Sequence, residues 1–247
     1  MKAGLVVGAS QGIGLEFVRQ LLGQNRCDRL YATYHDPQAP LLAWATEYSD
    51  PRLQLLPLDV TDETQMRGVS QTIQATSPNL HWVINCVGWL HDTAGQPEKS
   101  LRQINPDQLV RYFQVNAIAA VLLAKHLQPC FKHRERALFA TISAKVGSIG
   151  DNRLGGWYGY RASKAALNMF MRTTAIEYQR TCPGTIVVTL HPGTTDTRLS
   201  HPFQRNVPPE KLFSTERTVT QLLTVLDGLQ NQDSGEFFSW DGSRLPW

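Results

Sequence analysis

Tyr160 and Lys164 are the residues of this sequence whose types and spacing best suit proton transfer. They are four positions apart in the stretch Tyr158-Gly-Tyr-Arg-Ala-Ser-Lys164, which leads into a helix-forming run. On a helix this spacing places both side chains on one face, one turn apart. A phenol has a reference pKa of about 10, and a neighbouring ammonium lowers it toward the range that acid–base catalysis requires. Tyr158 has Ala162 at the same offset, so Tyr160 is the predicted acid–base residue.

The length and composition of the chain suit one large soluble α/β domain. Its 247 residues are 42% hydrophobic and 18% charged, enough for a full core. The net charge is only +3, without the basic stripe of a nucleic-acid surface. The one basic cluster follows a helix-like segment, which favours a helix C-terminus that complements the macrodipole. Its members are His126, Lys132, His133, Arg134 and Arg136.

The sequence also argues against a disulfide-rich, metal-binding, secreted or membrane-spanning protein. The four cysteines include no C-x-x-C pair, which is typical of reduced thiols in a cytoplasmic protein. The seven histidines have no metal-ligand spacing. The chain shows neither a signal-peptide core nor an apolar span of about 18 residues. We therefore expect a cytoplasmic protein without a metal site, a membrane span or a nucleic-acid partner.

Short apolar runs alternate with longer amphipathic segments along the chain. Some runs, such as 82–84 and 186–188, are continuously apolar, as in parallel strands covered on both faces. This alternation predicts a Rossmann-type doubly wound sheet of seven parallel strands with helices on both faces, in a single domain over 1–247. The predicted strands are 3–8, 29–34, 53–58, 81–86, 137–142, 185–191 and 235–240. The predicted helices are 12–24, 38–48, 62–76, 106–127, 158–180 and 215–231.

A glycine-rich turn, Gly8-Ala-Ser-Gln-Gly12-Ile-Gly14, connects the first strand to the first helix. Glycines at such a turn let a pyrophosphate approach the helix N-terminus, where free N–H groups and the helix dipole favour anions. The context is the one that a dinucleotide-binding motif requires. The alternative is a turn that merely needs positive φ angles.

The ends of the second and third strands bear on the choice of cofactor. The second strand ends in Thr33-Tyr34-His35, with Asp36 one step into the loop. A basic or hydroxyl-bearing tip suits a 2′-phosphate, whereas an acidic tip suits a 2′-hydroxyl, so this tip favours NADP over NAD. At the end of the third strand, Asp59 can accept from the adenine amino group. Alternatively, Asp59 or Thr61 caps the following helix.

Four further positions lie where a reacting group or a cover over the site is expected. Asn116 stands in the middle of the long helix 106–127, where asparagine is unfavourable by propensity and is either a surface residue or has a specific role. Ser143 follows the fifth strand at the edge where open α/β sheets bind ligands. The Pro-rich loop 192–214 is either a substrate lid or a plain surface excursion. Asn85, at the end of the fourth strand, can belong to an ordinary turn.

Taken together, these residues resemble the short-chain dehydrogenase/reductase family, from residue 3 to about 242. Its glycine turn, its turn after the fourth strand and its segment after the sixth strand are matched in order. Within the family, the stretches 88–92, 97–101 and 241–247 resemble C-factor/Sniffer-like carbonyl reductases. The sequence departs from the family at Val7, where a threonine hydroxyl usually braces the turn, and at Cys86 and Val87. The interval before Tyr160 is long and carries Gly155-Gly156-Trp157, which reshapes the substrate mouth.

The resemblance implies an oxidoreductase that interconverts a carbonyl and an alcohol with NADP. Tyr160 would donate a proton to the carbonyl oxygen, with its pKa lowered by Lys164. Ser143 would orient that oxygen, and Asn116 would hold a water that links Lys164 to solvent. The implied cofactor contacts are Gly8, Ser10, Gln11, Gly12, Ile13, Gly14, Tyr34, His35, Asp59, Val60, Asn85, Gly88, Tyr160, Lys164, Pro192, Gly193, Thr195 and Thr197.

The substrate wall, the assembly and a rival function complete the expectations. A small, fairly apolar substrate would lie against Trp89, Leu90, Trp157, Leu199 and Phe203. The helices 106–127 and 158–180 resemble the family's dimer-forming pair, which implies a homodimer or homotetramer. The rival is a dinucleotide-binding signalling protein of the C-factor type with little turnover. The intact set of Asn116, Ser143, Tyr160 and Lys164 speaks against this rival, because a sensor needs no proton relay.

Overall fold

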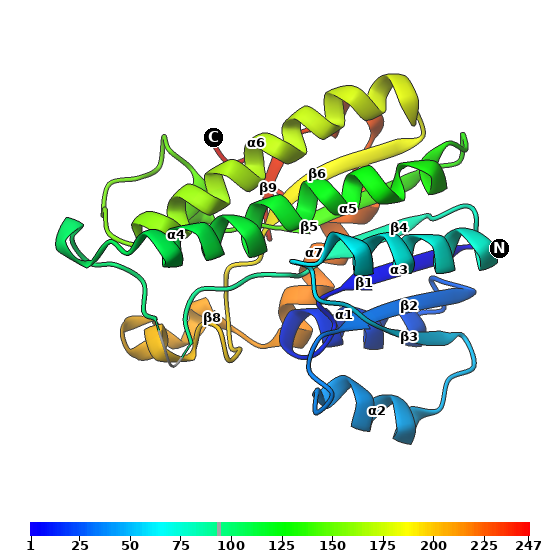
Figure 1. Ribbon diagram of the computed structural model, residues 1–247, viewed down its shortest axis with the longest axis horizontal. Helices are drawn as coiled ribbons and strands as arrows, with labels where there is room; N and C mark the ends of the chain where they lie inside the picture. The colour runs from blue at the N-terminus through cyan, green and yellow to red at the C-terminus, as the bar shows by residue number, and fades with distance from the viewer. Residues whose placement is uncertain (93–94) are drawn as a thin grey trace.

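Seven parallel strands form the central sheet, in the order β3-β2-β1-β4-β5-β6-β9 (Figure 1). The computed structural model describes residues 1–92 and 95–247. The strands of the sheet are β1 (Ala3–Val7), β2 (Arg29–Tyr34), β3 (Leu53–Pro57), β4 (Trp82–Asn85), β5 (Ala137–Ile142), β6 (Thr185–His191) and β9 (Phe237–Ser239). The strand order reverses between β1 and β4, and ligands of such sheets bind at the carboxyl edge beside this point. The predicted fold class is confirmed.

Helices cover both faces of the sheet and enclose two cores. One face carries α3 (Glu63–Thr76), α5 (Ala119–Leu127) and α6 (Tyr158–Thr181), which Figure 1 shows side by side. The other face carries α1 (Gly12–Gly23), α2 (Pro40–Tyr48) and α7 (Thr215–Gly228). Successive strand residues supply the two cores in turn: Leu5 and Val7 face α3 and α5, whereas Val6 faces α1 and α7. This two-sided burial explains the continuously apolar strands.

The helix predicted at 106–127 is helical over its whole length but contains a π turn. It consists of α4 (Pro106–Phe113), a π-helical turn over Gln114–Ile118, labelled η2, and α5. Asn116 lies inside the π turn, a local distortion that often marks functional sites. The predicted helix 106–127 is therefore present, and the π turn within it is a feature that the apolar pattern did not indicate.

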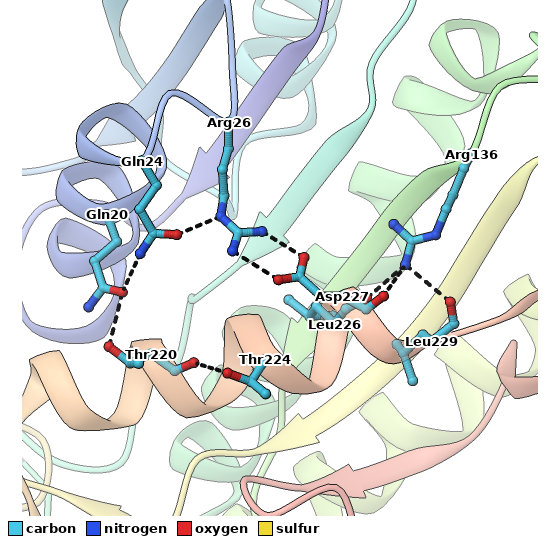
Figure 2. Close-up of polar contacts among 9 residues, drawn as sticks. All are labelled: Gln20, Gln24, Arg26, Arg136, Thr220, Thr224, Leu226, Asp227 and Leu229. Atoms are coloured by element: carbon cyan, nitrogen blue, oxygen red, sulfur yellow. Dashed lines mark hydrogen bonds and ion pairs between the residues drawn. The ribbon is translucent and has the colours of Figure 1, made fainter.

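The C-terminus of α7 shows what the basic cluster does (Figure 2). Arg136 Nη2 donates to the carbonyl oxygens of Leu226 at 2.8 Å and Leu229 at 3.1 Å, so it caps a helix distant in sequence. Arg26, which follows α1, forms two hydrogen bonds with the Asp227 carboxylate, at 2.6 and 2.9 Å. Arg136 therefore serves α7, not the helix that precedes it in the chain. The helix predicted to reach residue 231 ends at Gly228, where these carbonyls find other partners.

The segment after β6 folds back over the carboxyl edge. It contains two short paired strands, β7 (Thr194–Thr195) and β8 (Leu212–Phe213), and two 3₁₀ helices, η5 (His201–Asn206) and η6 (Pro209–Lys211). The remaining 3₁₀ helices are η1 (Leu101–Gln103), η3 (Gln128–Phe131), η4 (Lys145–Gly147) and η7 (Asn231–Asp233). Within the described ranges, no helix combines the length and apolarity needed to cross a bilayer.

Candidate active site

The glycine turn between β1 and α1 is a tight backbone cradle. Gly8 and Gly12 have φ angles of 75° and 57°, which favour glycine. A Cβ on Gly14 would lie 2.2 Å from the Gly8 carbonyl oxygen, so α1 reaches the turn only because residue 14 has no side chain. In this described region, Gln11 forms no side-chain cap and the first turn holds no acidic residue. The first N–H groups of α1 and the positive end of its dipole therefore fit a bound diphosphate.

Thr33 braces this turn from the neighbouring strand. The Gly8 N–H donates to Thr33 Oγ1 at 3.1 Å, and the Ala9 N–H donates to the Thr33 carbonyl at 2.9 Å. The hydroxyl that Val7 cannot provide is thus supplied by β2, which the sequence alone did not indicate. Thr33 is buried, so its hydroxyl belongs to the turn and not to a ribose site.

The tips of β2 and β3 lie side by side at the carboxyl edge. His35 is 74% exposed, and its Nε2 lies 3.6 Å from Asp59 Oδ2. Asp59 Oδ1 accepts from both the backbone N–H and the hydroxyl of Thr61, and these hydrogen bonds lower the Asp59 pKa. The N-cap of α3 is Asp62, which accepts from the Thr64 and Gln65 N–H groups. The alternative in which Asp59 or Thr61 caps this helix is therefore wrong, and the contact of Asp59 with an adenine amino group stays a prediction.

The predicted acid–base pair lies on the buried face of α6. Tyr160 is 6% exposed and Lys164 only 2%. Lys164 Nζ donates to the Ile142 carbonyl at 3.0 Å and lies 5.8 Å from the centre of the Tyr160 ring. Burial lowers the pKa of Lys164 to about 8, whereas it raises the pKa of Tyr160 above its usual value. The expected lowering of the phenol pKa by Lys164 is therefore not found in this structure, where burial and the neighbouring Tyr112 both raise it.

Ser143 meets α6 directly after β5. Its N–H donates to the Leu190 carbonyl at 2.7 Å, which continues the β5–β6 pairing past the last strand residue. Its hydroxyl donates to Asn168 Oδ1 at 2.7 Å, and both side chains are 2% exposed. Sequence reasoning missed Asn168. The signal was available, since Tyr160, Lys164 and Asn168 follow one another at intervals of four on a helix.

Asn116 holds the loop after β4 against α6. Its Oδ1 accepts from the Trp89 N–H at 2.7 Å, and its Nδ2 donates to the Trp89 carbonyl at 2.9 Å and to Ser163 Oγ at 3.0 Å. Both amide hydrogens are committed to these partners. The side-chain amide therefore joins the loop after β4 to α6, and the role predicted for Asn116 in holding a water for Lys164 stays a prediction. This also gives the mid-helix asparagine its reason.

The residues expected to form the substrate wall come together. Leu90 forms a buried cluster with Tyr112 and Tyr160, and the other four predicted wall residues pack against this cluster. The Trp157 ring centre lies 6.0 Å from that of Tyr160 and 4.8 Å from that of Phe203. Tyr112 was missed, although it lies four positions before Asn116; its hydroxyl donates to the Leu90 carbonyl at 2.6 Å. The wall of the candidate site is therefore apolar and largely aromatic.

The long interval before α6 shapes this wall. Gly155, Gly156 and Trp157 have φ angles of 65°, 66° and 52°, so the chain takes three left-handed steps before the helix begins. Glu98, another residue that sequence reasoning missed, anchors the same place. It is 1% exposed, and its Oε2 accepts from the Gly159 N–H at 3.2 Å in the first turn of α6. Its carbonyl accepts from the Trp157 N–H.

The segment after β6 reaches the glycine turn. A Cβ on Gly12 would lie 3.2 Å from Thr197 Cγ2, and one on Gly88 would lie 3.8 Å from Leu199 Cδ1. Gly193 has a φ angle of 73°. Thr195 is buried and hydrogen-bonded to Thr218 Oγ1 at 2.8 Å, so its hydroxyl braces the loop. This segment therefore covers the site.

Other predicted cofactor residues also lie at the carboxyl edge of the sheet. They contact neighbouring parts of the protein. The Ser10 carbonyl accepts from the Leu41 N–H at 3.1 Å, and Asn85 Oδ1 accepts from the Val87 N–H at 3.1 Å, which is the local turn contact. Ile13, Tyr34 and Val60 are partly buried against the two cores. Among the described residues, no three His, Cys, Asp or Glu side chains are placed to share a metal ion.

Comparison with known proteins assigns the chain to a family. A model of the short chain dehydrogenase family matches residues 2–208. The 1-hydroxy-2-glutathionyl-2-methyl-3-butene dehydrogenase of Rhodococcus sp. is 29% identical over 250 residues, which cover 100% of each chain. The C-signal of Myxococcus xanthus is 30% identical over 148 residues, 60% of this chain and 84% of that one.

Solved structures agree with this assignment. The NADPH-bound carbonyl reductase from chicken fatty liver superimposes with a TM-score of 0.88 at 28% identity, covering 99% of this chain and 98% of that one. The carbonyl reductase Sniffer of D. melanogaster has a TM-score of 0.87 at 23% identity over 100% of both chains, a likeness of fold. With the glycine turn, Ser143, Tyr160 and Lys164 at one edge of the sheet, this chain belongs to the short-chain dehydrogenase family and is an NAD(P)-dependent dehydrogenase or reductase.

Proposed function

We propose that the protein reduces small, apolar ketones or aldehydes with NADPH and catalyses the reverse oxidation of the alcohols. The observation that carries this proposal is the environment of Tyr160, a phenol buried among aromatic side chains with Lys164 one helical turn away. Such a wall favours an apolar group beside the reacting carbonyl. When bound, the nicotinamide supplies the hydride for the carbonyl carbon.

Each residue of the site then has a defined task. Tyr160 stays protonated at neutral pH, since burial raises its pKa, and donates its hydrogen to the carbonyl oxygen. Ser143 donates a second hydrogen bond that orients this oxygen. Lys164 returns a proton to Tyr160 after turnover. Asn116 keeps Trp89 and Ser163 in place around them.

The cofactor would lie along the carboxyl edge of the sheet. Gly8, Gly12 and the first turn of α1 would hold the diphosphate, and Thr197 would close over it. Preference for NADP over NAD is supported by the exposed His35 at the tip of β2. Asp36, the nearby acidic residue, already accepts from the Gln38 N–H at 2.8 Å.

A screen of the purified protein tests this function. NADPH and NADH are titrated first, and binding of NADPH with clearly the lower Kd is expected. NADPH oxidation is then followed with aldehydes, aromatic and aliphatic ketones, and quinones. Turnover with at least one apolar carbonyl supports the proposal. Tight cofactor binding without oxidation across the set favours the rival, a dinucleotide-binding signalling protein, to which the likeness to C-signal points.

The pKa of Lys164 gives the reaction a pH dependence. Because this pKa is lowered to about 8, the ammonium predominates below pH 8 and is lost above it. The kcat of carbonyl reduction is therefore expected to fall as the pH rises through about 8. In Lys164→Arg the guanidinium does not titrate in this range, so the residual activity should lack the inflection. Lys145→Arg is the matched control at an exposed position, and it should keep the inflection. An inflection that persists in Lys164→Arg would assign it to another group.

We also propose that the chain forms a homo-oligomer through α4, α5 and α6. Val110, Ile118, Met169 and Ile176 are exposed apolar side chains on these helices and the π turn between them. Multi-angle light scattering at micromolar concentration should return a multiple of the 27.7 kDa chain mass. A monomeric mass would contradict this assignment.

A further inference from the structure

Ser143 has one hydrogen to donate, and in the structure it donates that hydrogen away from the substrate. The acceptor is Asn168 Oδ1, at 2.7 Å. A hydroxyl offers one donor and two acceptor lone pairs. While this bond stands, Ser143 can accept a hydrogen bond on the substrate side but cannot donate one. The proposed reduction requires Ser143 as a donor, so something must release its hydrogen.

The other end of the Asn168 amide is unsatisfied. Nδ2 is fully buried and has no hydrogen-bond acceptor among the described residues. A buried amide donor without a partner is unfavourable, because it has lost its hydrogen bonds to water without replacing them. Rotating the amide by a half turn exchanges Oδ1 and Nδ2 and leaves the position of both residues unchanged. Nδ2 would then donate to Ser143 Oγ, and the Ser143 hydrogen would be free.

Two threonines lie on the same sheet face as Ser143. Thr141 precedes Ser143 by two residues and therefore lies on the same face of the sheet, and Thr189 is its register partner on β6. Both hydroxyls are buried, and both lack a partner in the described part of the chain. Neither hydroxyl forms a hydrogen bond with Asn168 in the present orientation, although a hydroxyl can donate to an amide oxygen.

We propose that Asn168 is a positioning residue for Ser143. In the working enzyme its Nδ2 donates to Ser143 Oγ, which leaves the hydroxyl hydrogen for the substrate oxygen. Asn168 thereby decides whether Ser143 meets the substrate as a donor or as an acceptor. This inference rests on the proposed function and deepens it, because it adds a residue that acts on the carbonyl through Ser143.

Two substitutions separate this role from packing. Asn168→Asp keeps the shape but offers only acceptors, so it traps the Ser143 hydrogen; kcat is expected to fall about 10²-fold, the effect of losing one donor to a developing oxyanion. Asn168→Leu, of similar size, removes donor and acceptor alike, and about a tenfold fall is expected because the Ser143 hydroxyl then rotates freely. In both variants the Kd of NADPH should stay within about twofold, since neither touches the nucleotide turn.

A double-mutant cycle with Ser143→Ala provides the decisive comparison. If Asn168 acts through Ser143, neither substitution should lower kcat further by more than about twofold when Ser143 is already alanine. Equal losses in both backgrounds would overturn the proposal, as would wild-type kcat in Asn168→Asp. Thermal unfolding checks each variant; if Asn168→Asp does not fold, the cycle with Asn168→Leu decides alone.

Neutron diffraction reads the amide orientation without reference to activity. Crystals of the wild-type protein with NADP are expected to show deuterium on Nδ2 directed at Ser143 Oγ. Deuterium on Ser143 Oγ directed at Asn168 Oδ1 would overturn the inference even if the enzyme is active. A wild-type protein without turnover would instead refute the proposed function, whatever the orientation of the amide.

Discussion

Tyr160→Phe is expected to lower the kcat of carbonyl reduction by about 10²- to 10⁴-fold, the usual contribution of a positioned general acid. The substitution removes one oxygen and keeps the ring. The packing of that ring against Trp157 and Tyr112 should therefore survive. NADPH affinity should change little, because the diphosphate and adenosine are held elsewhere. Stopped-flow measurement of NADPH oxidation, together with fluorescence titration of the cofactor, separates the two effects.

Tyr158→Phe is the matched control for this variant. Tyr158 lies two residues earlier on the same helix and is partly exposed, with Ala162 where Tyr160 has Lys164. Its loss should leave kcat within about twofold of wild type. Turnover near the wild-type rate in Tyr160→Phe would show that the phenol is not the general acid and that another group donates the proton.

Gly14→Ala is expected to abolish detectable cofactor binding and to destabilise the fold. The new Cβ would lie 2.2 Å from the Gly8 carbonyl oxygen and 2.9 Å from its carbon, and neither is the end of a flexible side chain. Overpacking of this kind lowers the free energy of unfolding by about 1–3 kcal/mol and sometimes more. Relief requires α1 to move off the turn, which misplaces the N–H groups that would meet the diphosphate. We expect NADPH affinity to fall at least about 100-fold, equivalent to about 2.8 kcal/mol.

Gly23→Ala tests whether any added methyl on α1 has this effect. Gly23 ends the same helix, and a Cβ there meets nothing within 4 Å. This substitution should raise the free energy of unfolding by up to about 1 kcal/mol and leave NADPH affinity unchanged. Chemical denaturation and isothermal titration calorimetry measure the two quantities. Unimpaired binding by Gly14→Ala would mean that the turn adjusts and does not set the diphosphate position.

The spacing of apolar residues, together with the residues that end strands and helices, was enough to predict most of the fold. The apolar runs at 82–84 and 186–188 could be read as doubly covered strands because both sheet faces are buried, so no polar alternation dilutes them. Helix ends were less certain. The end of α7 depends on Arg136, a residue far away in the sequence, and the π turn at Asn116 changes no residue type that a pattern would detect. Contacts between residues far apart in the sequence therefore determine the end of α7 and accompany the π turn at Asn116.

The sequence by itself determined which chemical groups are available and roughly where they stand. A phenol and an ammonium four apart, a serine after the fifth strand and glycines in the first turn follow from residue type, spacing and strand order, all of which are local. Only the tertiary structure decided what these groups experience. Burial moves the pKa values of Tyr160 and Lys164 in opposite directions. Thr33 replaces a missing brace, and Asn116 and Asn168 commit their amides to Trp89 and Ser143. Hydration and hydrogen-bond partners depend on residues brought together from distant parts of the chain, so no local pattern specifies them.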